Sequence, residues 1–228
     1  MLPRPPRAAK TASSTTKNAS RASTASKPIP KRNKDALITP PAQPLPTPAL
    51  GDSEINYSYA IARGEMGVLS FEPYKSLILP FWAFRTVPIA HSSATALSSI
   101  FTSYVERGDL VGADMTRKFI QMGMTRARRY ANYRGGRKYD AESGEKKTKW
   151  EGGDDAQRAA RTEKEEASEL FKGHWRWCIE HEGYKELKER WQLQKKEWDR
   201  GHGIKGGKEQ STPTPKEERE VDDDVGAD

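Results

Sequence analysis

The sequence predicts a mainly α-helical domain of the α+β class, with about four helices and a short two-strand element, between two disordered tails. Apolar residues recur at the helical period of 3.6 residues in several segments of the middle of the chain. One short segment near residue 60 instead alternates apolar residues with small or polar ones, as half-buried strands do, and a second short strand candidate follows it. Only 34% of the 228 residues are hydrophobic, so part of the chain cannot bury a core.

Composition divides the chain into a disordered basic tail (1–53), a single globular domain (54–200) and a disordered acidic tail (201–228). Residues 1–50 carry nine basic residues, one acidic residue and no aromatic residue. Within them, the proline-rich stretch Pro40–Leu50 predicts an extended linker. The acidic tail carries eight acidic and four basic residues, whereas the whole chain has a net charge of +7.

The single cysteine, Cys178, excludes an intramolecular disulfide and a zinc site built on cysteine pairs. It predicts an intracellular, reducing compartment, either the nucleus or the cytoplasm. No stretch of about 18 apolar residues occurs, so we expect no membrane-spanning segment. The basic run Lys27–Lys34 resembles a nuclear import signal; a solvated basic tail and, less readily, a mitochondrial presequence are the alternatives.

The two expected strands are Tyr57–Ile61 and Met66–Phe71, with Gly64 between them. Helices follow, each with an apolar stripe at helical spacing. Their expected ranges are Ser92 or Ser93 to Arg107, Leu110 to Tyr133, Glu163 to Gly183 and Tyr184 to Trp198. A polar, glycine-rich loop over residues 140–162 joins the second of these helices to the third.

The segment Arg117–Lys138 concentrates positive charge, because it contains eight Lys or Arg residues and no acidic residue. Like charges repel, so a folded domain that holds them together is expected to have an anionic partner. On the helical wheel Arg117 and Arg128 lie opposite the apolar stripe. That opposite face is the candidate anion-binding surface.

Arg126 falls within the apolar stripe of the same helix rather than on its charged face. A charge at such a position must be paired or must reach solvent along its stem. We expect either a buried ion pair with Glu65 or Glu72, a role in a site, or a head group that extends to water.

Basic residues also accompany aromatic residues earlier in the chain. Lys75 and Arg85 lie on either side of Phe81 and Trp82, and an aromatic and basic surface suits base stacking with phosphate contacts. Alternatively, the aromatic residues belong to the core. The expected anion-binding or nucleic-acid-binding residues are Lys75, Arg85, Arg117, Arg128, Arg129, Arg134, Arg137 and Lys138.

No strong catalytic signature is present. Neither a phosphate-binding GxxxxGK[ST] motif nor a GxGxxG motif occurs. His174 and His181 lie two helical turns apart, which is too far for one metal ion without further ligands. We therefore expect no metal site and no cofactor, and no catalytic residue is assigned.

Three long segments resemble a known family, and the likeness extends over about residues 55–200. The segments are Ala62–Thr86, Gly108–Asn132 and Gly135–Asp140. They are similar to the family catalogued as domain of unknown function 4385. The resemblance implies an intracellular microbial domain and carries over no activity. The chain departs from the family's pattern at Ala83 and Tyr133, where a basic residue and a histidine are expected.

The sequence is compatible with three functions. The most favoured is a module that binds nucleic acid or another polyanion through the basic segment, because a localised patch argues for binding. The second is an adaptor whose basic surface receives an acidic protein or the chain's own residues Glu217–Asp224. The third is an enzyme acting on a phosphorylated small molecule, with arginines holding the phosphate and Glu65, Glu72 or Asp114 transferring a proton.

Overall fold

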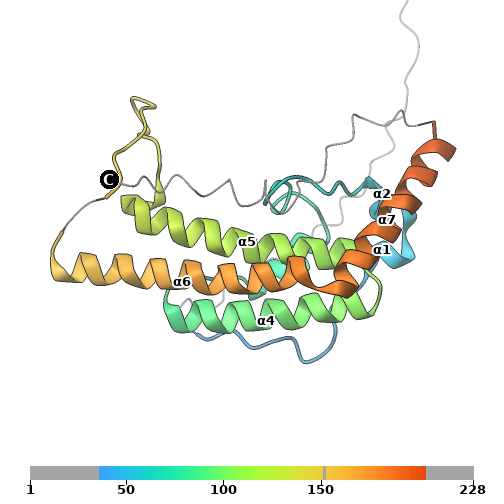
Figure 1. Ribbon diagram of the computed structural model, residues 1–228, viewed down its shortest axis with the longest axis horizontal. Coiled ribbons are helices and arrows are strands. Elements are labelled where there is room, and N and C mark those ends of the chain that lie inside the picture. Colours follow the sequence, from blue (N-terminus) through green and yellow to red (C-terminus); the bar gives the residue numbers. More distant parts are fainter. Residues whose placement is uncertain (1–35, 151–152, 204–228) are drawn as a thin grey trace, which may run out of the picture. The chain divides into compact units, whose positions relative to one another are not determined.

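The computed structural model describes residues 36–150 and 153–203, all of which belong to the unit Arg32–Asp228 (Figure 1). Within these ranges the chain forms seven α-helices and two short 3-10 helices, and no strand. The α-helices are α1 (Pro48–Gly51), α2 (Ser53–Ser58), α3 (Tyr74–Ile78), α4 (Val87–Glu106), α5 (Leu110–Asn132), α6 (Asp155–Glu180) and α7 (Glu182–Gly201). The predicted disorder of residues 1–35 and 204–228 lies outside the described residues.

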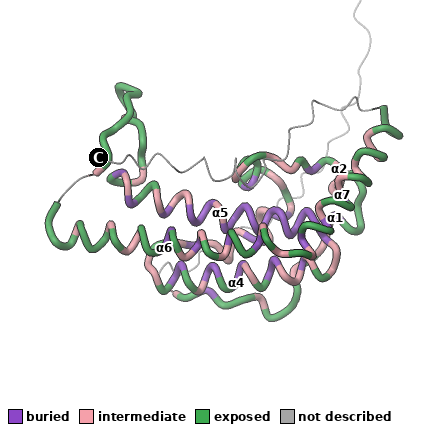
Figure 2. The backbone as a smooth tube through the Cα atoms, viewed as in Figure 1, coloured by how far each residue is buried: buried purple, intermediate pink, exposed green. Residues whose placement is uncertain are grey.

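Helix α5 is the centre of the fold. It packs against both α4 and α6, which run alongside it (Figure 1). Every residue from Leu110 to Ile120 is buried, so this half of the helix is enclosed on all sides (Figure 2). A helix that is buried all round is normally apolar, yet this one carries Asp114, Arg117 and Lys118 in the buried half.

Side-chain caps fix where the long helices begin. The Oγ1 atom of Thr86 accepts a hydrogen bond from the Ile89 amide, and Pro88 occupies the first turn of α4. Asp109 caps α5 by accepting from the Gly112 amide at 2.9 Å. Between these helices, Gly108 takes a left-handed φ of +76°, which ends α4 without steric cost.

Two predicted helices begin earlier than the apolar stripes suggested. Helix α4 starts at Val87 instead of Ser92 or Ser93, because Thr86 supplies the cap. Helix α6 starts at Asp155, within the predicted loop, because Asp154 accepts from the Gln157 amide. The first turns of α6 are exposed to solvent, so they carry no apolar stripe that could reveal them.

The predicted two-strand element and the α+β class are wrong. Asp52 caps a helix by accepting from the amides of Glu54 and Ile55, so Tyr57 lies in α2. The second predicted strand, Met66–Phe71, is a series of tight turns. In it, amides donate to carbonyls three residues back, and Gly67 has a left-handed φ of +80°.

The packed chain also begins before residue 54, the predicted start of the domain. Ile38 is buried and its amide donates to Ser92 Oγ at 3.0 Å. The carbonyl of Leu45 accepts from Arg107 Nη1 at 2.7 Å, and the Ala49 amide donates to Tyr74 Oη at 2.9 Å. The proline-rich segment therefore lies against the domain, because its carbonyls and amides find partners there.

Two glycines let α5 approach its neighbours closely. A Cβ atom added at Gly112 would lie 2.4 Å from the ring of Tyr104 in α4, and one at Gly123 would lie 2.7 Å from the ring of Phe171 in α6. Both rings are fully buried, so neither can move aside at low cost.

We predict that Gly123→Ala lowers the free energy of unfolding by about 1–2 kcal/mol, because overpacking against Phe171 outweighs the higher helix propensity of alanine. The matched control is Gly173→Ala in α6, where an added Cβ meets no atom within 4 Å. That substitution should raise the free energy of unfolding by up to about 1 kcal/mol. Urea unfolding measures both, and equal effects of the two substitutions would contradict the close approach.

Candidate anion-binding surface

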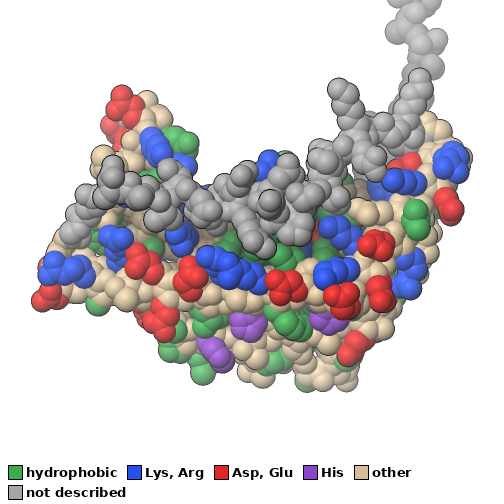
Figure 3. All heavy atoms as spheres, in the orientation of Figure 1, with side chains coloured by type: hydrophobic (Ala, Val, Ile, Leu, Met, Phe, Trp, Pro, Cys, Tyr) green, Lys and Arg blue, Asp and Glu red, His purple; other side chains and the backbone are tan. Residues whose placement is uncertain are grey.

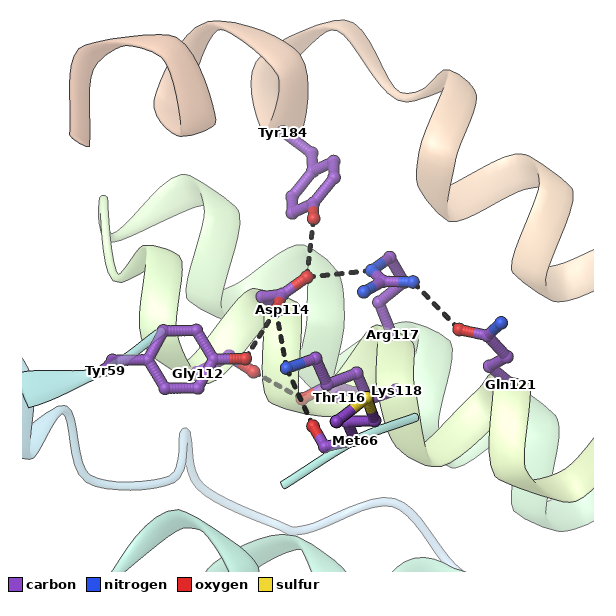
Figure 4. Close-up of polar contacts among 9 residues, drawn as sticks. All are labelled: Tyr59, Met66, Gly112, Asp114, Thr116, Arg117, Lys118, Gln121 and Tyr184. Atoms are coloured by element: carbon purple, nitrogen blue, oxygen red, sulfur yellow. Dashed lines mark hydrogen bonds and ion pairs between the residues drawn. The ribbon is translucent and has the colours of Figure 1, made fainter. Parts of the chain in front are cut away.

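The buried half of α5 holds a network of charged side chains centred on the Asp114 carboxylate (Figure 4). Arg117 Nε lies 2.8 Å from Asp114 Oδ1, and Lys118 Nζ lies 3.5 Å from Oδ2. Tyr184 from α7 donates to Oδ1 at 2.7 Å, and Tyr59 donates to Oδ2. The exposed fractions of Asp114, Arg117 and Lys118 are 0%, 6% and 1%.

Burial and charge pull the pKa values of this network in opposite directions. Burial alone would raise the pKa of Asp114, but the charges of Arg117 and Lys118 and the two tyrosine hydrogen bonds lower it well below its usual range. Burial raises the pKa of Tyr59 and Tyr184, and the adjacent carboxylate raises them further. At neutral pH Asp114 is therefore ionised and both tyrosines are neutral donors.

The network reaches beyond α5. Arg117 Nη1 donates to Gln121 Oε1 at 3.1 Å, one turn further along the helix (Figure 4). Lys118 Nζ donates to the Met66 carbonyl at 3.2 Å and lies 4.9 Å from the centroid of the Tyr59 ring. These contacts neutralise the predicted site residue Arg117 internally, so the structure places it in the interior and not with the exposed basic residues.

Lys75 and Arg85 differ in their surroundings. Lys75 Nζ lies 2.5 Å from the Glu72 carboxylate, and Ser76 donates to the same side chain, so Lys75 is already paired. Arg85 is exposed, and its carbonyl accepts from Lys164 of α6. The aromatic residues between them, Phe81 and Trp82 included, are partly buried and packed on the core, which matches the core alternative.

The remaining predicted residues gather at the C-terminal end of α5 and just beyond it. Arg129, Arg134, Arg137 and Lys138 are exposed. Arg128 is half-buried and lies 3.3 Å from Glu169 of α6, a pair that solvent screens. Cations at this position also interact favourably with the partial negative charge at the C-terminal end of the helix dipole.

Residues 137–150 fold back over the end of α5, and we call them the basic flap. Its two arms pair where the Lys147 amide donates to the Lys138 carbonyl at 2.9 Å. The Trp150 amide donates to the Asn132 carbonyl at 2.8 Å, and Arg161 of α6 donates to the Trp150 carbonyl at 3.0 Å. The flap is thus attached to both α5 and α6.

Between the flap and the end of α5 lies a cleft of about 650 Å³, which we call the basic cleft. Its lining residues are Tyr133, Arg134, Lys147, Thr148, Lys149 and Trp150. Sequence reasoning missed Lys147, Lys149 and Trp150, because it treated residues 140–162 as a loop of mixed charge. The only signal was the short run KKTKW at residues 146–150.

The flap also carries acidic residues, so its charge is not of one sign. Asp140 lies 3.3 Å from Lys147 Nζ, and Glu142 and Glu145 lie in the same turn. Hydrogen bonds from the amides of Glu142 and Ser143 lower the pKa of Asp140. Along α6, Lys and Arg alternate with Asp and Glu on the face shown in Figure 3, so that face carries no single-sign patch.

Arg126 forms neither of its two predicted ion pairs in the described part of the chain. Glu72 is bound to Lys75 and Ser76, and Glu65 accepts from Thr125 Oγ1 at 2.7 Å. The Arg126 guanidinium instead lies 6.0 Å from the centroid of the Trp82 ring.

Across the described ranges, no three His, Cys, Asp or Glu side chains cluster in a way that could hold a metal ion. No helix in those ranges has the length and apolar character needed to cross a membrane.

The family described as "Domain of unknown function (DUF4385)" matches residues 45–194, which is more than half of the chain. The chain belongs to this family. No curated protein and no solved structure matches the chain. The DUF4385 match includes the whole of α5 and the basic flap, and it ends within α7.

We predict that Asp114→Asn lowers the free energy of unfolding by about 3–5 kcal/mol, because it leaves two buried cations without a counter-charge. Glu169→Gln, which breaks the exposed pair with Arg128, is the control and should cost about 0–1 kcal/mol. Chemical unfolding at neutral pH measures both. A similar, small effect for the two substitutions would contradict a structural role for the network.

The lowered pKa of Asp114 also predicts a pH dependence. Its contribution to stability is fully present above the unfolded-state pKa of about 3.9 and is lost as the pH falls toward the lower folded-state pKa. The stability difference between the wild type and Asp114→Asn should therefore be constant above about pH 5 and shrink at lower pH. A difference that grows on acidification would contradict this assignment.

Proposed function

We propose that the protein is a nucleic-acid-binding module that contacts its ligand through the basic cleft. The observation that carries the proposal is the lining of this cleft, in which Arg134, Lys147 and Lys149 stand beside the aromatic residues Tyr133 and Trp150. Cations supply the sequence-independent contacts to phosphate. Aromatic faces supply stacking for unpaired bases.

The aromatic lining favours single-stranded over double-stranded ligands. Bases in a duplex are stacked on each other and cannot reach Trp150, which lies half-buried at the base of the flap. Beyond the cleft, the exposed residues Arg129, Arg137 and Lys138 extend the positive surface at the end of α5. A strand leaving the cleft therefore meets further cations for its phosphates.

The adaptor function uses the same surface, with an acidic protein or residues Glu217–Asp224 in place of a nucleic acid. Those residues lie outside the described chain, and the two functions differ in the need for aromatic stacking. The enzyme function has less support. Of its proposed proton donors, Glu72 and Asp114 are paired with Lys75 and Arg117, and Glu65 accepts from Thr125 Oγ1. None of the three acids lines the basic cleft.

We predict that Arg134→Ala with Lys147→Ala weakens binding of a fluorescent single-stranded oligonucleotide at least tenfold and flattens its salt dependence. Each lost phosphate contact should reduce the slope of log K against log salt by about 0.7. The control is Arg176→Ala with Arg190→Ala, which removes the same charge from exposed positions of α6 and α7. Fluorescence anisotropy measures both affinities. Equal losses of affinity in the two double variants would mean that net charge alone governs binding, and would contradict binding in the basic cleft.

Removal of the indole tests stacking separately. Trp150→Ala should weaken binding of the same oligonucleotide by about 1–3 kcal/mol, because it removes a stacking face. The slope of log K against log salt should not change, because no charge is removed. Its control is Trp177→Ala in α6, whose side chain is 42% exposed and lies outside the cleft lining. If Trp150→Ala binds as the wild type does, the basic surface acts without stacking and the adaptor function is favoured.

A further inference from the structure

A second cleft, of about 300 Å³, lies between α5 and the turns that follow Arg63. We call it the loop cleft. Its lining residues are Glu65, Gly67, Val68, Leu69, Ser70, Met122 and Arg126. It shares no residue with the basic cleft, and the proposed function makes no use of it.

Arg126 lines the loop cleft, and Trp82 lies beside Arg126 outside that lining. Arg126 Nε is inaccessible to solvent and has no hydrogen-bond partner, and the same holds for Trp82 Nε1. The two side chains are neighbours, because the Arg126 guanidinium lies 6.0 Å from the centroid of the Trp82 ring. Arg126 Nε is thus out of reach of a ligand in the cleft, and an oxyanion there would contact Arg126, which lines the cleft, through the Nη end of its guanidinium.

Glu65 places a negative charge in the same cleft. Its Oε2 atom accepts a hydrogen bond from Thr125 Oγ1 at 2.7 Å, which fixes the carboxylate on α5. Nevertheless, no ion pair joins Glu65 to Arg126 within 4.0 Å in the described chain, although both line the cleft. One anion and one cation held apart in a cleft complement a ligand that carries both charges.

The rest of the cleft is apolar and structurally defined. Val68, Leu69 and Met122 supply hydrocarbon surface. The turns that carry Val68 and Leu69 are closed by backbone hydrogen bonds from Val68 to Glu65 and from Ser70 to Gly67, at 3.3 and 3.1 Å. Lys118 holds the Met66 carbonyl, so the buried Asp114 network fixes the wall of the loop cleft.

We propose that the loop cleft binds a small zwitterion, a free α-amino acid with an aliphatic side chain. Its carboxylate lies on Arg126, its ammonium group lies on Glu65, and its side chain contacts Met122 and the apolar turn. This site is independent of the basic cleft. It gives the protein a small-molecule ligand in addition to its polyanion.

The test compares leucine with two analogues that each lack one charge, 4-methylpentanoate and isopentylamine. The readout is the Trp82 indole N–H resonance in a ¹H–¹⁵N spectrum of the full chain, assigned through Trp82→Phe. Leucine should shift this resonance and bind at least tenfold more tightly than either analogue. Equal affinities for leucine and 4-methylpentanoate would overturn the zwitterion, and no shift with up to about 10 mM leucine would overturn the site.

Variants assign the two charges. Arg126→Gln should abolish the response to leucine, whereas Arg128→Gln, two residues along the same helix, should retain it. Glu65→Gln should remove the preference for leucine over 4-methylpentanoate. Because an unfolded variant would be uninformative, Arg126→Lys serves as the second variant. It keeps the charge, loses the planar pair of Nη donors and should weaken leucine binding at least fivefold. Unchanged leucine binding in both Arg126 variants would overturn the proposal.

The same experiment separates this proposal from the nucleic-acid proposal. Arg134→Ala with Lys147→Ala should leave the leucine response intact, since neither residue lines the loop cleft. If leucine binding fails while oligonucleotide binding remains, only the loop cleft is refuted. If the double variant loses the leucine response, the two clefts are not independent and the assignment to Arg126 and Glu65 is overturned.

Discussion

The fold depends on one buried carboxylate. Asp114 is inaccessible to solvent and is neutralised by Arg117 and Lys118 from its own helix. Two tyrosines bring further parts of the chain to it, Tyr59 from the segment after α2 and Tyr184 from α7. An ionised group so deeply buried is tolerated only when all of these partners are in place. The carboxylate therefore fixes the position of α5 against the elements around it. It also keeps two basic residues buried as its counter-charges.

This constraint divides α5 into two parts with different roles. The first part is enclosed, and its cations hold the structure together. The last turns carry exposed Arg129 and end where the basic flap folds back. Trp150 bonds to the helix end through its backbone, so this attachment does not depend on its indole. On α5, positive charge is thus exposed in the last turns, whereas the cations of the first half are buried.

Sequence patterns predicted the long helices because an apolar stripe reports a helix wherever one face is buried. They failed at Tyr57, whose alternation with polar neighbours suggested a strand, because the cap at Asp52 starts a helix there. The wheel placed Arg117 opposite the apolar stripe, but a wheel shows one helix and not the distant segments that cover its other face. Trp150 was missed for the same reason, since its place beside Asn132 depends on how the flap returns.

One measurement compares the buried half of α5 with the basic flap directly: acetylation of native lysines by an N-hydroxysuccinimide ester, followed by mass spectrometry, with and without a saturating single-stranded oligonucleotide. The account predicts that Lys118, 1% exposed, stays unreactive in both states, while Lys147, 41% exposed, reacts freely and is protected by the ligand. Lys185, 47% exposed on α7, should react equally in both states. Modification of Lys118 at the rate of Lys185, or an unprotected Lys147 at saturation, would contradict it.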